Sequence, residues 1–168
     1  FCKQKNQSLT IKAFKIFIKN HKDFKLVIIG QGPDKYKLKK LIGKLNLQKS
    51  VVMKNWQNNM SKYYSNSKLL IFPSLYEGLP NTLIEAQAAG LPIISSNCPS
   101  GPKEILLNGK LGSLFNVGDY ENLTKKIYNF YKNKKILKQK SILAKKYLYR
   151  FDYEKNLNKY FKLLNKHL

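Results

Sequence analysis

The chain has 168 residues, of which 43% are hydrophobic, so it has the length and apolar content of one ordinary domain with its own core. Its formal net charge is +23, from 32 lysines and arginines against 9 acidic residues. This composition excludes a disordered tail, and no apolar run is long enough for a transmembrane helix. The amino terminus, FCKQKNQSLT, lacks the zones of a signal peptide, so we expect a cytoplasmic protein.

Cysteine and histidine are too few and too scattered for a metal centre. Cys2 and Cys98 lack CxxC spacing, and the two histidines, His21 and His167, lie far from any acidic cluster. We therefore expect two free thiols and no metal site. The sequence also opens without Met, close to a predicted helix, which indicates a fragment of a longer protein.

The first elements follow from apolar spacing. Apolar residues at helical intervals predict a helix at about 8–20. The run KLVIIG, at 25–30, predicts a strand that is buried on both faces of a sheet. After it, the pattern predicts a helix that begins at Pro33 and buries one side, formed by Leu38, Leu41, Ile42 and Leu45.

The rest of the chain continues to alternate between strands and helices. Strands are predicted at 50–55, 68–74, 91–96 and 112–115. The helices between and after them are a short one at 59–67, one that begins at Pro80 and ends at Gly90, and lysine-rich helices from about 119 to 168. This order predicts an α/β fold, a Rossmann-like parallel sheet covered by helices and followed by carboxyl-terminal helices. Ligands of such sheets bind at the carboxyl ends of the strands.

The high positive charge is compatible with three kinds of surface. Arg150 is the only arginine, so 31 of the 32 basic residues are lysine, which lacks the planar fork that favours phosphate and base recognition. Abundant Lys, Asn, Ile and Tyr are also what an AT-biased genome favours in its codons. The lysines therefore form a solvated surface without a partner, a surface that binds an anionic membrane, or a surface that binds nucleic acid. The scarcity of arginine disfavours nucleic acid.

The glycines of GQG, at 30–32, resemble the start of a dinucleotide-binding fingerprint. That fingerprint would need a third glycine where Lys35 stands and an acidic residue about 20 positions further on, and both are missing. This excludes a nicotinamide cofactor. Gly32 either lets the backbone approach a ligand closely or forms a tight strand-to-helix turn, and the sequence does not distinguish the two.

The stretch EGLPNTLIE, at 77–85, is typical of a phosphate-binding helix start. Pro80 opens the helix, and Gly78 would allow the backbone an unusual turn before it. The N–H groups of Leu79, Asn81 and Thr82 would point out from the positively polarised end. Such an end binds phosphate.

Two glutamates, Glu77 and Glu85, flank this helix start. A carboxylate beside a bound phosphate would be repelled unless it faced hydroxyl groups, and a nucleotide sugar carries hydroxyls on both sides of its diphosphate. Glu85 would then accept hydrogen bonds from the ribose, and Glu77 would reach the sugar. The alternatives are a solvated Glu85 and a Glu77 that only caps the helix.

The segment FPSLYEGLPNTLIEAQAAGLPIISSNCPSGPKEIL resembles the donor-binding signature of the retaining family-4 glycosyltransferases of GT-B fold, with Glu77 and Glu85 at its E-x7-E element. The similarity extends to KQKNQSLTIKAF, which resembles the family's lysine-containing loop and first helix, to LVIIGQGP, and to VVMKNWQNNMSKYYSNSKLLIFPS, which resembles the base-binding region. The variant NCPSGPKEIL is most similar to members that build capsular, O-antigen or other surface polysaccharides.

The resemblance implies roles for individual residues. Glu77 would lie at the donor sugar, the amides from Gly78 to Thr82 at the diphosphate, and Glu85 at the ribose. Lys5 matches the lysine that neutralises the diphosphate in the family, and its alternative is one more surface lysine.

The base-binding region of the family falls on Trp56 and Gln57 of this chain. A single tryptophan is about as often part of a core, so this alternative stays open for Trp56.

The resemblance also implies that residues 1–168 are the nucleotide-sugar-binding, carboxyl-terminal half of a GT-B enzyme, from which the amino-terminal acceptor domain is absent. The expected function is retaining transfer from a UDP-, GDP- or ADP-sugar, without a metal or other cofactor, to a glycan or lipid-linked acceptor in surface polysaccharide synthesis. The enzyme would work in the cytoplasm or at the inner membrane face, and this chain alone would be inactive. The segment FDYEKNLNKYFKLLNKHL resembles the family segment that crosses back toward the missing domain.

Two rival functions make different demands on the sequence. A basic, lysine-rich module that binds nucleic acid or an anionic membrane without catalysis would use lysines rather than Glu77 and Glu85. A nucleotide-sugar epimerase of related fold would need a nicotinamide fingerprint, which is absent.

Overall fold

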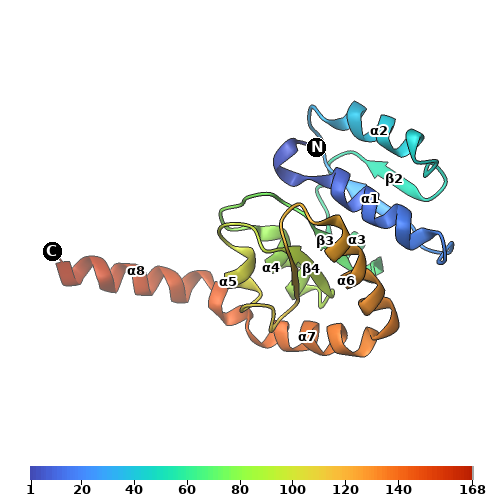
Figure 1. The fold of residues 1–168 in the computed structure, drawn as a ribbon. Helices are drawn as coiled ribbons and strands as arrows, with labels where there is room; N and C mark the ends of the chain where they lie inside the picture. The colour runs from blue at the N-terminus through green and yellow to red at the C-terminus, as the bar shows by residue number, and fades with distance from the viewer. Residues whose placement is uncertain (168) are drawn as a thin grey trace.

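Short parallel strands form the centre of the molecule and are covered by helices (Figure 1). The computed structural model describes residues 1–167. The strands are β1 (Leu26–Ile29), β2 (Val51–Lys54), β3 (Leu70–Phe72), β4 (Ile93–Ser96) and β5 (Ser113–Phe115). They form two sheets, β1-β2 and β3-β4-β5, and every pair is parallel. The predicted α/β fold is thus confirmed, although the strands do not form one continuous sheet.

The helices follow the predicted order, with one addition. The α-helices are α1 (Gln7–Ile18), α2 (Lys35–Lys44), α3 (Ser61–Asn66), α4 (Asn81–Ala88), α5 (Pro102–Ile105), α6 (Tyr120–Lys132), α7 (Lys134–Lys146) and α8 (Tyr153–His167). Two 3-10 turns complete the described chain, η1 (Lys3–Lys5) and η2 (Leu148–Phe151). The sequence analysis did not predict α5, because a single turn is too short to show a helical period.

Strand β4 lies between the two hydrophobic cores of the molecule. All four of its residues are buried. Ile94 belongs to the core that α1 and α6 share, and Ile93 belongs to the core beneath α4 and α5. Since successive side chains of a strand point to opposite faces, β4 contributes side chains to both cores. This burial fixes the start of the loop that follows β4.

Strand β1 is not buried on both faces, so that prediction is wrong. Val27 is 43% exposed and pairs in register with Val52, which is 40% exposed. Ile28 and Val51 lie on the opposite face, in the core to which α1 and α2 contribute. Both helices therefore pack on one face of this small sheet, and the face that carries Val27 and Val52 is exposed.

Helix α2 begins two residues later than predicted. Pro33 and Asp34 form a turn, and Lys35 is the first helical residue. The N–H of Asp34 donates to the carbonyl of Phe1 (3.0 Å), so the start of the chain contacts this turn. Helix α4 agrees more closely with prediction, because it follows Pro80 and stops before Gly90, whose φ is 70°.

The last helix, α8, extends away from the body of the molecule (Figure 1). Most of its large apolar side chains are exposed, among them Tyr160, Phe161 and Leu163. Within residues 1–167, the structure contains no helix with the length and apolarity needed to cross a membrane.

Candidate functional site

The candidate site lies along the carboxyl ends of the strands. The loops after β3 and β4 leave their sheet at one edge, because these two strands are parallel. The loop after β2 is linked to the same region by α3, since Tyr63 contacts Gln57 and Tyr64 contacts Glu85. In chain order, the three loops carry Trp56 and Gln57, then the stretch 75–80, and then 97–101. The turn η1 at the start of the chain joins them through hydrogen bonds to the second loop.

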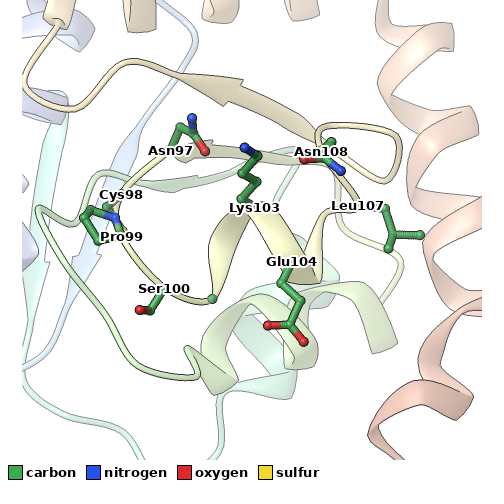
Figure 2. Close-up of a pocket in the computed structure, with 9 residues that line it drawn as sticks. Asn97, Cys98, Pro99, Ser100, Lys103, Glu104, Leu107 and Asn108 are labelled. Atoms are coloured by element: carbon green, nitrogen blue, oxygen red, sulfur yellow. The ribbon is translucent and has the colours of Figure 1, made fainter.

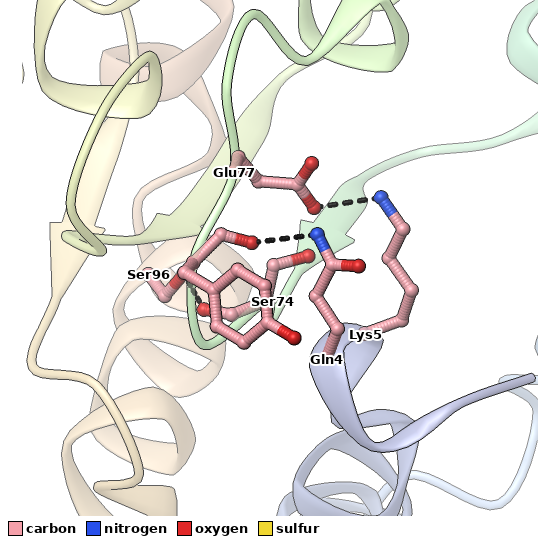
Figure 3. Close-up of polar contacts among 6 residues, drawn as sticks. Gln4, Lys5, Ser74, Glu77 and Ser96 are labelled. Carbon is pink, nitrogen blue, oxygen red and sulfur yellow. Dashed lines mark hydrogen bonds and ion pairs between the residues drawn. The ribbon is translucent and has the colours of Figure 1, made fainter.

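The structure brings the two predicted catalytic residues, Lys5 and Glu77, into contact. Lys5 Nζ donates to Glu77 Oε1 at 2.7 Å, across 72 positions of sequence (Figure 3). The Glu77 side chain is only 8% exposed, whereas that of Lys5 is 42% exposed. A nearly buried carboxylate needs a partner charge, and Lys5 supplies it while its ammonium group stays accessible.

Main-chain and side-chain hydrogen bonds hold this pair in place (Figure 3). The N–H of Leu75 donates to the carbonyl of Gln4 (2.8 Å), and Gln4 Nε2 donates to the carbonyl of Tyr76 (2.9 Å). On the other side, the Ser96 hydroxyl donates to the carbonyl of Ser74 (2.6 Å) and ties the end of β4 to the same loop. The loop that carries Glu77 is therefore anchored from two directions.

The start of α4 offers unpaired amide groups beside Glu77. Pro80 occupies the N-cap position, and the N–H of Leu83 already donates to its carbonyl (2.9 Å). The first turn of a helix leaves its N–H groups without helical partners, and none of the backbone hydrogen bonds outside helices and strands in residues 1–167 uses the N–H of Leu79, Asn81 or Thr82. These amides have no backbone partner in that set, and their role in binding an anion stays a prediction.

The turn before α4 depends on Gly101 rather than on Gly78. Within residues 1–167 Gly78 is not among the glycines with positive φ, and a Cβ at Gly78 would meet nothing within 4 Å. The prediction that Gly78 adopts an unusual backbone conformation is therefore wrong, and the position beside it is open space. Gly101 has φ of 83°, and a Cβ there would lie 2.3 Å from Pro80 Cδ and 2.4 Å from the Gly78 carbonyl oxygen. The loop after β4 thus supports the turn by close backbone contact.

Glu85 is held by a residue that the sequence analysis did not single out, Tyr64 of α3. The Tyr64 hydroxyl donates to Glu85 Oε2 at 2.8 Å. Burial raises the pKa of Tyr64 well above its ordinary value, and the neighbouring Glu85 raises it further, so the hydroxyl stays protonated and acts as the donor. The pattern around 59–67 contained no signal for this contact, because it joins two helices 21 positions apart.

Trp56 and Gln57 line a hollow of about 510 Å³. Trp56 is 61% exposed, which rules out the alternative that it belongs to the core. Gln57 Nε2 donates to the carbonyls of Asn55 and Trp56 (3.1 Å each), and its Oε1 accepts from the Tyr63 hydroxyl (3.2 Å). An exposed aromatic face beside fixed amide groups can stack on a planar ring.

Gly32 contacts the chain itself. A Cβ at this position would lie 2.4 Å from the Phe1 carbonyl oxygen and 2.7 Å from its nitrogen. Close packing against Phe1 therefore accounts for this glycine, a contact that was not among the two predicted alternatives.

A second hollow, of about 610 Å³, lies next to Glu77 and outside the set of predicted residues. Figure 2 shows Lys103 of α5 between Asn97 and Asn108 at this hollow. Its rim joins the site, because the N–H of Glu77 donates to the carbonyl of Pro99 (3.3 Å). The segment follows β4 at the same edge of the sheet, which is the signal that could have identified it.

The residues that commonly bind metals do not gather at this edge. Within the described residues, no group of three His, Cys, Asp or Glu side chains is arranged to hold a metal ion. Cys2 and Cys98 are free thiols, as predicted, and burial raises the pKa of Cys98.

Comparison with known proteins places this arrangement in a family. Residues 1–147 match the family described as glycosyl transferases group 1. The chain is 47% identical over 103 residues to an uncharacterized glycosyltransferase, MJ1059, of Methanocaldococcus jannaschii, covering 61% of this chain and 25% of that protein. It is 36% identical over 120 residues to the N-acetylgalactosamine-N,N'-diacetylbacillosaminyl-diphospho-undecaprenol 4-alpha-N-acetylgalactosaminyltransferase of Campylobacter jejuni, covering 71% of this chain and 32% of that protein. The chain thus spans a quarter to a third of these relatives.

Solved structures share the fold over nearly the whole chain. A variant of S. aureus TarM in complex with fondaparinux, alpha-GlcNAc-glycerol and UDP is 25% identical, with a TM-score of 0.90 over 98% of this chain and 34% of that one. The C-terminal domain of LpcC, a group 1 glycosyl transferase of Francisella tularensis, is 19% identical, with a TM-score of 0.78 over 91% of this chain and 82% of that one. The fold is that of the carboxyl-terminal half of GT-B glycosyltransferases, and the chain belongs to the group 1 glycosyltransferase family.

Proposed function

We propose that this chain is the donor-binding, carboxyl-terminal half of a retaining glycosyltransferase and that it binds a UDP-sugar. The observation that carries the proposal is the contact between Lys5 and Glu77 beside the open start of α4. One edge of the sheet then holds a cation and free amides for a diphosphate, and a carboxylate for the adjoining sugar. UDP is the favoured donor nucleotide because TarM, at 25% identity, was solved with UDP.

The proposed chemistry follows the charges that develop during transfer. Breaking the bond between the sugar and the diphosphate leaves positive charge on the sugar ring and negative charge on the departing phosphate. Lys5 and the amides of Leu79, Asn81 and Thr82 stabilise the negative charge, since fixed donors are most effective where charge grows. Glu77 orients the sugar and favours its oxocarbenium-like character.

The remaining subsites are assigned by their chemistry. Trp56 and Gln57 contact the base, and Glu85 accepts hydrogen bonds from the ribose. The hollow at Asn97 and Lys103 adjoins Glu77, so it receives the sugar or the group to which the sugar is transferred. Gly32 is left out of the binding set, because Phe1 occupies the space beside it.

The acceptor and the domain arrangement follow from the relatives. The Campylobacter jejuni enzyme carries a diphospho-undecaprenol substrate in its name. We propose a glycan or lipid-linked acceptor of surface polysaccharide synthesis, bound mainly by an amino-terminal domain outside this sequence. The rival module without catalysis gives no reason to pair Lys5 with a nearly buried Glu77, so we favour the enzyme.

A thermal-shift series tests the nucleotide assignment. UDP at about a hundredfold excess over its dissociation constant stabilises a protein by about 2.7 kcal/mol, so we expect a Tm increase of roughly 5–10 °C for this chain. NAD should give no shift, because the dinucleotide fingerprint is absent. GDP and ADP measured in parallel show whether the site prefers uracil, and equal shifts with UDP and NAD would contradict the assignment.

Lys5→Met is expected to weaken UDP binding about tenfold and to leave uridine binding unchanged, since Lys5 contributes a charge-assisted contact to the diphosphate alone. Calorimetry with both ligands measures the two affinities. Lys3→Met is the matched control, because Lys3 is an exposed lysine in the same turn, η1. Equal losses of UDP and uridine affinity would show that Lys5 supports the fold and does not contact the diphosphate.

A further inference from the structure

Tyr64 contacts Glu85 from within the core, although no role was predicted for Tyr64 itself. We propose that Tyr64 is a positioning residue that holds Glu85 in the orientation needed to bind the ribose. The inference rests on the proposed function, because it assigns Tyr64 a role only if Glu85 binds the ribose. It adds a residue that acts through Glu85 rather than on the ligand.

The ring of Tyr64 is fixed by packing. Tyr64 is only 7% exposed and belongs to the core that also contains Phe72 of β3 and Leu83 and Ala86 of α4. Its backbone N–H donates to the carbonyl of Met60 (3.0 Å), which holds the first turn of α3. The hydroxyl therefore reaches Glu85 from a rigid base and not from a mobile surface chain.

Glu85, in contrast, is an exposed side chain on α4. A free glutamate samples several rotamers and loses that freedom when it binds a ligand. The hydrogen bond from Tyr64 to Oε2 restricts the carboxylate before the ligand arrives. A carboxylate has about four lone-pair sites, so one bond to Tyr64 leaves capacity for two ribose hydroxyls.

Tyr64 also connects the carboxylate to the start of α4. The Thr82 side chain, in the first turn of α4, lies close enough to the Tyr64 hydroxyl to lower its pKa, and the backbone amide of Thr82 belongs to the proposed diphosphate site. The adjacent residue of α3, Tyr63, donates to Gln57 on the base side. Two consecutive tyrosines of one short helix therefore hold groups of the base and ribose subsites, and this is how α3 sets the distance between them.

The test compares UDP with 2′,3′-dideoxy-UDP, which lacks both ribose hydroxyls, in the full-length enzyme. The wild type should prefer UDP about tenfold or more, and Glu85→Gln should remove most of this preference. Tyr64→Phe keeps the ring and deletes the hydroxyl, so we expect the preference to fall to about threefold while the dideoxy-UDP affinity stays unchanged. In the Glu85→Gln background, Tyr64→Phe should have no further effect on the preference.

Tyr36→Phe is the control, because it removes an exposed hydroxyl from α2, outside the proposed site, and it should retain the full preference. If Tyr64→Phe retains the full preference while Glu85→Gln loses it, the inference is wrong and the proposed function stands. If Tyr64→Phe weakens both nucleotides equally, Tyr64 is only a structural residue and the inference is also wrong. A wild type that binds UDP and dideoxy-UDP equally, or binds neither, would overturn the proposed function itself.

Discussion

Glu77→Gln is expected to reduce the turnover of the full-length enzyme by at least about 100-fold while leaving UDP affinity equal or slightly tighter. The sugar, not the nucleotide, is the proposed partner of this carboxylate, so its loss acts on the transition state more than on nucleotide binding. The substitution also removes the negative charge that Lys5 pairs with at 2.7 Å, so the ammonium group of Lys5 becomes more available to the diphosphate. Steady-state kinetics together with UDP calorimetry separate the two effects.

Glu121→Gln provides the control for this substitution. Glu121 is an exposed glutamate in the first turn of α6, outside the candidate site, so its replacement should leave turnover and UDP affinity unchanged. If the turnover of the Glu77→Gln enzyme stayed within a few-fold of the wild type, another residue would have to orient the sugar. A large loss of UDP affinity would instead indicate that the loop after β3 has moved.

Gly101→Ala is expected to lower the free energy of unfolding by about 3 kcal/mol and to weaken UDP binding at least tenfold. A left-handed φ costs an alanine about 1–2 kcal/mol, and forcing an extra carbon into a packed site costs about 1–3 kcal/mol more. The new Cβ would lie 2.3 Å from Pro80 Cδ and 2.4 Å from the Gly78 oxygen, so the turn that presents the α4 amides must shift. Urea unfolding and UDP calorimetry measure the two losses.

Gly118→Ala separates backbone strain from displacement of the turn. Gly118 has a similar φ, 79°, but nothing lies within 4 Å of its Cβ position. This variant should lose only about 1–2 kcal/mol of stability and keep its UDP affinity. Gly101→Ala with normal UDP affinity would show that the loop after β4 does not support the diphosphate turn.

Most of the secondary structure could be predicted from the sequence, because each element carries its own local signal. The runs around β1, β2, β3 and β4 are short and apolar, and Pro80 and Gly90 mark the start and stop of α4. The carboxyl-edge position of Glu77 follows from the same pattern, since the glutamate comes shortly after a predicted parallel strand. Burial could not be predicted in this way. An apolar run shows that β1 suits a core, but whether its second face is covered depends on which helices pack there.

The sequence by itself thus determined the α/β order of the chain and the helix start at Pro80, and family resemblance singled out Lys5, Glu77 and Glu85 as candidate site residues. Only the tertiary structure decided that Lys5 contacts Glu77, that Tyr64 holds Glu85, and that Gly101 supports the turn at Pro80. Periodicity records which side of an element is apolar and contains no information on its partner. Contacts that join residues 21 to 72 positions apart are set by strand order and by the close packing of loops at one edge of the sheet.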